Sequence, residues 1–185
     1  MACTTFLTDG RPLNCKNTAG GLKTVYFIRS TREDWTVVDK EISNFTGVYP
    51  QNLAYKFVLK GNSSFEQTIN ASEENRTTFY EQVLNLTLPK LSKVDQDNLE
   101  NLSQSEGFQV IIEDYNDNFF VMGLEHQVAV TGGTVVSGAS MGDMSGYTLT
   151  LTGMEQDPAL LVSPTTQTET EWTFSGGDTL TIDLN

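Results

Sequence analysis

The chain has 185 residues, enough for one domain with a full hydrophobic core, and its 15 glycines against 5 prolines suit a β-protein with many turns. Its formal net charge of −13, from 24 acidic and 11 basic residues, argues against binding nucleic acid by neutralising phosphates. No run of about 18 apolar residues occurs, which excludes a membrane-spanning helix. We therefore expect one acidic, β-rich domain that spans no membrane.

Residues 1–21 are weakly patterned, and we expect them to form an N-terminal arm of a domain that covers residues 1–158. They lack the basic and apolar regions of a signal peptide. Cys3 and Cys15 could pair within this arm, but two cysteines in a chain without a secretion signal are more often free thiols.

Strand patterns dominate the next part of the chain. The first predicted strands, separated by charged turns, cover residues 24–28, 35–38 and 42–45. Two further runs of alternating apolar residues flank Gly61-Asn62, which is a turn signal. Residues 53–72 are therefore predicted to form one hairpin. Residues 73–88 fit a helix or a strand, and their threonines favour the strand.

One amphipathic helix is predicted at about residues 93–106. Ser92 can cap it, Asp95 lies in the first turn near the positive end of the helix dipole, and Gly107 lies just past the end. An apolar stripe is predicted to cover one side of the sheet and comprises Leu91, Val94, Asn98, Leu99 and Leu102.

The region after the helix holds the clearest strand signals. Two apolar runs flank the turn cluster at residues 114–118, which predicts a hairpin. Residues 146–153 alternate strictly, which predicts a half-buried strand with Tyr147, Leu149 and Leu151 facing the core. The small, polar residues from 131 to 146 predict a long, mobile loop.

The last part of the chain, residues 159–185, is sparse in apolar residues and is expected to form a C-terminal extension. It ends in a predicted hairpin that turns at Gly176-Gly177-Asp178, between strands at residues 172–174 and 180–182.

Residues that carry chemistry are few. His126 is the only histidine, so the sequence excludes a multi-histidine metal site. Asp114, with Glu125 eleven positions later, half-matches a calcium loop, but Phe119 stands where that loop needs glycine and the flanking strands favour a hairpin turn. The serines of residues 131–146 have no neighbouring base to activate them. We therefore expect no catalytic residue, no metal and no cofactor.

The domain closes with a pattern that comprises Val130-Thr131-Gly132-Gly133, Gly138, Gly142-Asp143, the strand Gly146-Tyr147-Thr148-Leu149-Thr150-Leu151-Thr152-Gly153, and Glu155. This pattern and the order of the elements resemble structural proteins of tailed bacteriophages that infect Bacteroidetes-type hosts, and most of all the tail-tube class. The resemblance covers about residues 53–158 and implies a β-sandwich or open barrel with one flanking α-helix, assembled into stacked hexameric rings. Residues 1–50 and 159–185 lie outside it and are expected to link subunits.

The resemblance also implies a function. The chain is expected to be a non-enzymatic virion protein, a tail-tube subunit around a DNA-conducting channel, made in the host cytoplasm and located in the virion tail. Its expected partners are copies of itself, other tail or connector proteins, and passing genomic DNA that it does not bind specifically. A channel lined with carboxylates and threonines would repel DNA phosphates.

Two groups of residues are candidates for these roles. The polar face of the predicted hairpin is expected to line the channel, through Ser64, Glu66, Thr68 and Asn70. The competing hypothesis places this face outside, where Lys56 and Lys60 of the partner strand neutralise Glu66. The predicted loop is expected to link subunits, through Gly132, Gly133, Val135, Gly138, Met141 and Asp143.

Two alternative functions stay open. One is a connector or tail-completion ring between head and tail. The other, from a different class, is a monomeric β-sandwich that binds carbohydrate or a protein and uses Trp35, Tyr115 and Trp172 as stacking platforms.

Overall fold

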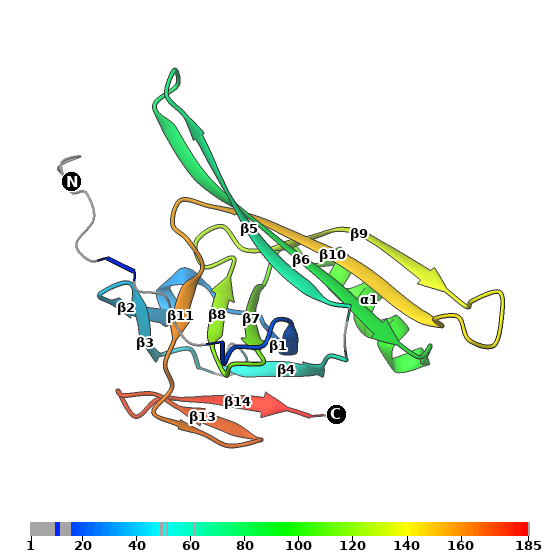
Figure 1. The fold of residues 1–185 in the computed structure, drawn as a ribbon. Helices are drawn as coiled ribbons and strands as arrows, with labels where there is room; N and C mark the ends of the chain where they lie inside the picture. Colours follow the sequence, from blue (N-terminus) through cyan, green and yellow to red (C-terminus); the bar gives the residue numbers. More distant parts are fainter. Residues whose placement is uncertain (1–9, 12–15, 49, 51, 61, 185) are drawn as a thin grey trace.

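The computed structural model describes residues 10–184 except 12–15, 49, 51 and 61, so both cysteines lie outside the described residues. Within these residues the protein is mainly β, with a ten-stranded sheet (sheet A), a four-stranded sheet (sheet B) and one α-helix (Figure 1). The curled sheets form a half-barrel or sandwich, which confirms the predicted fold class.

Sheet A contains strands from both ends of the chain. In spatial order they are β12 (Thr166–Gln167), β13 (Glu171–Thr173), β14 (Thr179–Asp183), β4 (Leu53–Val58), β1 (Leu22–Ile28), β7 (Gln109–Asp114), β8 (Phe119–Met122), β11 (Leu160–Val162), β3 (Glu41–Phe45) and β2 (Trp35–Val38). The predicted hairpins β7–β8 and β13–β14 are confirmed. The segment expected as a C-terminal extension thus supplies four strands of this sheet.

An aromatic core fills the concave side of sheet A. The rings of Trp35 and Phe45 lie 4.5 Å apart, and Phe174, beyond β13, lies 6.5 Å from Trp35. Asn44 Nδ2 donates a hydrogen bond of 2.8 Å to Asp178 Oδ2 between the same two regions. Because β2 and β13 stand near opposite edges of the sheet, these contacts mean that sheet A curls until its ends meet.

Sheet B packs on the other face of sheet A. It contains β5 (Ser64–Ser72), β6 (Thr77–Pro89), β10 (Gly146–Glu155) and β9 (Ala129–Val136), in that spatial order and all antiparallel. The predicted alternation of β10 is confirmed, because Tyr147, Leu149 and Leu151 are buried. The pairing of β10 with β6 ends at Glu155 and Tyr80, so the far end of the β5–β6 hairpin projects beyond the rest of the sheet (Figure 1).

The predicted hairpin over residues 53–72 is wrong. β4 pairs with β1 in sheet A, whereas β5 pairs with β6 in sheet B. The buried Leu59 keeps the chain in sheet A through a hydrogen bond of 2.9 Å from its N–H to the Lys23 carbonyl oxygen. The chain then crosses to the other layer. There β5 forms nine residue pairs with β6 instead of the expected hairpin pairing with β4. Pairing with the long strand β6 thus overrides the local Gly-Asn turn signal.

The predicted long loop is also wrong over its first part. Residues 131–136 belong to β9, which pairs with β10, and only residues 137–145 form a loop. Gly133 is required by this pairing, because a Cβ atom there would lie 2.8 Å from the Thr148 carbonyl oxygen. Glycine in this strand marks close approach of two backbones rather than a mobile segment.

The helix α1 (Lys93–Gln104) begins as predicted, with Ser92 Oγ accepting a hydrogen bond of 3.1 Å from the Asp95 N–H. Leu99 and Leu102 pack against the core between the two sheets. The predicted stripe is too wide, however, because Val94 is 63% exposed. The helix covers the core along a narrow band near its C-terminal half.

We expect Leu102→Ala to lower the melting temperature by about 4–8 °C. The substitution removes apolar contacts worth about 2 kcal/mol, the lower end for a leucine in a core, because Leu102 is only partly buried. Glu100 lies on the exposed face of the same helix, so Glu100→Ala should shift the melting temperature by less than about 1 °C. Equal shifts in a thermal scan would show that Leu102 does not face the core.

Candidate assembly surface

The outer face of sheet B collects the residues predicted to line a channel. Ser64, Glu66, Thr68 and Asn70 alternate along β5 on the face opposite Phe65, which packs in the core. The register continues this face onto β6 and β10, in rows such as Ser64–Asn85–Thr150 and Glu66–Val83–Thr152. The structure therefore brings the four predicted residues together and extends their face across the sheet.

Hydroxyl and amide groups bond to one another along this face. Thr150 Oγ1 donates to Asn85 Oδ1 at 3.0 Å, and the hydroxyls of Thr134 and Thr148 lie 2.6 Å apart. The four strands of sheet B contain no lysine or arginine, while Glu66 and Glu81 supply carboxylates on the face. The face is therefore mostly polar, with Val83 and Phe79 as apolar members, and its strands carry no cation to hold a phosphate.

The outer edges of sheet B are long and carry no paired strand. Within the described residues, no strand pairs with the outer edge of β5 or of β9, which have nine and eight residues. Neither strand contains proline or lysine, the residues that natural proteins use to block edge pairing. By contrast, the edge strands of sheet A, β12 and β2, have two and four residues.

Strand direction makes the two edges complementary. Four antiparallel strands give β5 and β9 opposite directions. A second copy, rotated about an axis roughly parallel to the strands, would therefore place its β5 antiparallel beside β9. Both edges can be paired by repeating this one contact.

A buried glutamine fixes sheet B to the rest of the protein. Gln82 Oε1 accepts a hydrogen bond of 3.0 Å from the Gly123 N–H, at the end of β8. Its Nε2 donates to Gln67 Oε1 at 3.3 Å, and Gln67 Oε1 also accepts from the Ala159 N–H at 2.7 Å. This contact could not be predicted from the sequence, because a glutamine in an alternating strand suggests a solvent-facing position.

The residues predicted to link subunits fall in two places. Gly132, Gly133 and Val135 lie in β9, whereas Gly138, Met141 and Asp143 lie in the loop at residues 137–145. This loop connects β9 to β10 at the end of sheet B that lies opposite the projecting end of the β5–β6 hairpin (Figure 1). The Asp143 carboxylate accepts backbone N–H bonds from Ser140 at 2.8 Å and Ala139 at 2.9 Å, and Met141 is fully exposed.

The aromatic residues proposed as stacking platforms do not form one. Trp35 and Trp172 are 3% and 2% exposed and belong to the aromatic core of sheet A. Tyr115 is exposed in the β7–β8 turn. The prediction that the two tryptophans present a binding surface is therefore wrong.

The remaining candidate chemistry has structural partners. Both Asp114 oxygens bond to Asn116 and Asn118 in the β7–β8 turn, which accounts for the partial calcium-loop pattern. His126 lies 3.5 Å from the buried Glu155 carboxylate, which also accepts the Glu125 and His126 N–H groups. No group of three or more potential metal ligands occurs in the described part of the chain.

Comparisons with protein-family models, with curated proteins and with solved structures found no match. Among the described residues, no helix has the length and apolar character needed to cross a membrane.

We expect Asp143 to order the loop in a pH-dependent way. The backbone bonds from Ser140 and Ala139 hold the pKa of Asp143 below its ordinary value of 3.8. Because the folded pKa is lowered, these bonds are complete above about pH 4 and are lost as pH falls through the folded value. Hydrogen exchange at the Ala139 and Ser140 amides should accelerate in Asp143→Ala at pH 7. Unchanged exchange at these two amides would show that Asp143 does not order the loop.

Proposed function

We propose that this chain is a structural virion protein, the subunit of a phage tail tube, which assembles edge to edge through sheet B into rings. The observation that carries the proposal is the pair of long, unblocked edges on β5 and β9. Unpaired edge groups favour association with another strand, and closure of a ring removes every such edge. The proposed ring is hexameric, as the resemblance to tail-tube proteins implies, and the rings stack into a tube.

The outer face of sheet B lines the channel in this proposal. With carboxylates at Glu66 and Glu81 and no cation on its strands, this face would let DNA pass without holding its phosphates. The competing hypothesis required Lys56 and Lys60 on the strand paired with Glu66. Lys56 lies in β4 of sheet A and Lys60 follows β4, whereas the strand that pairs with Glu66 is β6, so neither lysine neutralises Glu66 across a strand pair.

A connector or tail-completion ring between head and tail is the second candidate. It would assemble through the same two edges of sheet B, but it would form a single ring rather than a stack of rings. The buried Trp35 and Trp172 weigh against the third candidate, a monomeric binding module that stacks ligands on those residues. Stacks of rings in electron micrographs of the purified protein would favour the tube, and single rings the connector.

Proline substitutions test the edge pairing. Adjacent residues of a strand point their N–H groups to opposite sides. Of the two variants Thr134→Pro and Val135→Pro, one therefore removes an N–H group that points away from β10, toward the free edge. We expect that variant to fold with a melting temperature near that of the unmodified protein and to form no rings by light scattering and electron microscopy.

The matched control is Gln167→Pro at the edge of sheet A. The Thr168 N–H bonds to the Glu171 carbonyl oxygen, and adjacent N–H groups of a strand point to opposite sides, so the Gln167 N–H points outward. This variant should assemble normally. Normal rings from both folded β9 variants would rule out pairing through β9.

A charge reversal tests the channel face. In Glu66→Lys, a ring of positive charge would face the channel, so assembled particles should retain duplex DNA at low salt and release it as salt rises. Co-sedimentation of DNA with the particles measures this retention. Glu106→Lys, beyond the end of α1 and outside sheet B, provides the control and should retain none. If Glu66→Lys particles assemble but retain no DNA at low salt, Glu66 does not face the channel.

A further inference from the structure

The β5–β6 hairpin projects from the body without support. Its free part, residues 69–80 (the projecting hairpin), begins where the pairing of β6 with β10 ends. A two-stranded hairpin alone in water is only marginally stable. Ile69 is 63% and Phe79 38% exposed, and the register places them on opposite faces. The projecting hairpin therefore presents apolar side chains on both faces, and beyond the pair of Tyr80 with Glu155 its strands pair only with each other among the described residues.

A groove of about 590 Å³ lies between α1 and β4. Its apolar lining includes Phe57, Val58, Leu88 and Val94, and Val58 and Val94 are 69% and 63% exposed. This groove explains why Val94, predicted to cover the sheet, does not reach it. The side chain stands on the wall of an open groove.

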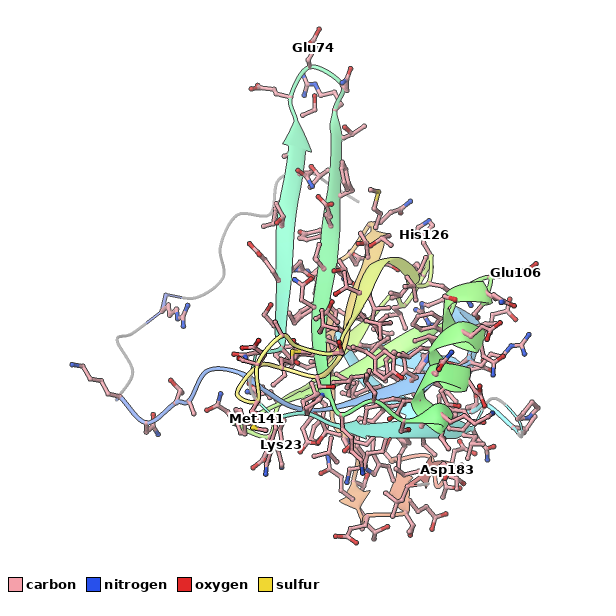
Figure 2. All side chains as sticks on the ribbon, turned by 90° about the vertical axis from the view of Figure 1, so that its right-hand side faces the viewer. Lys23, Glu74, Glu106, His126, Met141 and Asp183 are labelled. Carbon is pink, nitrogen blue, oxygen red and sulfur yellow. The ribbon has the colours of Figure 1, made fainter. Side chains whose placement is uncertain are left out.

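The projecting hairpin and the groove occupy opposite ends of the molecule. Figure 2 labels Glu74 at the tip of the hairpin and Asp183, which lines the groove, at the far end of the body. The hairpin therefore cannot reach the groove of its own chain. A contact between these two different surfaces would be heterologous, and such contacts repeat in one direction unless rotation closes them.

Charge favours this pairing. The tip carries Glu73 and Glu74 with one cation, Arg76, so it is net acidic. The groove lining contains Arg29 and Lys56, and its two carboxylates, Asp95 and Asp183, make it neutral in a chain of net charge −13. An acidic hairpin would be repelled less there than on most of this acidic surface.

We propose that the projecting hairpin of one copy docks into the α1–β4 groove of a second copy. This inference rests on the proposed function and deepens it, because strands that run along the axis of a ring point the hairpin toward the next ring. Ile69 or Phe79 enters the apolar groove, and Glu73 and Glu74 lie near Arg29 and Lys56. The contact joins successive rings, whereas pairing of β5 with β9 joins neighbours within one ring.

Cysteine cross-linking tests the docking. In a background with Cys3→Ser and Cys15→Ser, the chain would carry Asn75→Cys at the hairpin turn and Asn98→Cys on the groove wall. Mild oxidation should give a ladder of dimers, trimers and larger species on a denaturing gel. Mixing the two single-cysteine chains should give dimers only. The control pairs Asn75→Cys with Glu106→Cys, which lies outside the groove lining, and should give no ladder.

The outcomes separate this docking from ring formation. Rings with a ladder support both proposals, and a ladder without closed rings supports docking while contradicting the ring. Rings that stack without a ladder, or that link equally through Glu106→Cys, overturn the docking and leave the ring proposal standing. Monomers without a ladder contradict both. In a second measurement, Ile69→Ser with Phe79→Ser should leave rings intact and abolish their stacking, and continued stacking would contradict the docking.

Discussion

The pairing of β6 with β10 supports every surface on which the proposed function depends. Over ten residue pairs, from Gly146 with Pro89 to Glu155 with Tyr80, it aligns the rows of the polar face. It also holds β9 and β5 at the two outer edges and fixes where the hairpin becomes free. Its buried side, including Leu84, Leu86 and Leu151, attaches sheet B to the core and so orients that face outward.

The edge strands of the two sheets differ in length and in how far they are left open to pairing. Sheet A curls until its ends meet around an aromatic core, and its edge strands are very short. Sheet B is smaller, yet its edges are long and free of proline and lysine. Since unpaired backbone groups promote association, this contrast concentrates the tendency to assemble in one sheet. The same sheet presents the face without cations, so assembly and channel lining are properties of one surface.

Local chemistry predicted much of the fold but not the strand order. The cap at Ser92, the alternation of β10 and the turn at Asp114 are set by neighbouring residues, and each was found as expected. The division of residues 53–72 between two sheets depends on distant partners, as does the use of Gly133 in a strand. The four polar residues of β5 were predictable from their period of two. The free edges were not, because an edge exists only once the spatial order of strands is known.

In the proposed ring, β5 of one copy pairs with β9 of the next. Amide hydrogen exchange, compared between dilute monomer and assembled protein, tests it directly at the backbone. We expect alternate amides of β5 and β9 to exchange at solvent rates in the monomer and to become protected together on assembly, while those of β2 and β12 do not change. Assembled particles in which β5 and β9 still exchange at the monomer rate would contradict the account.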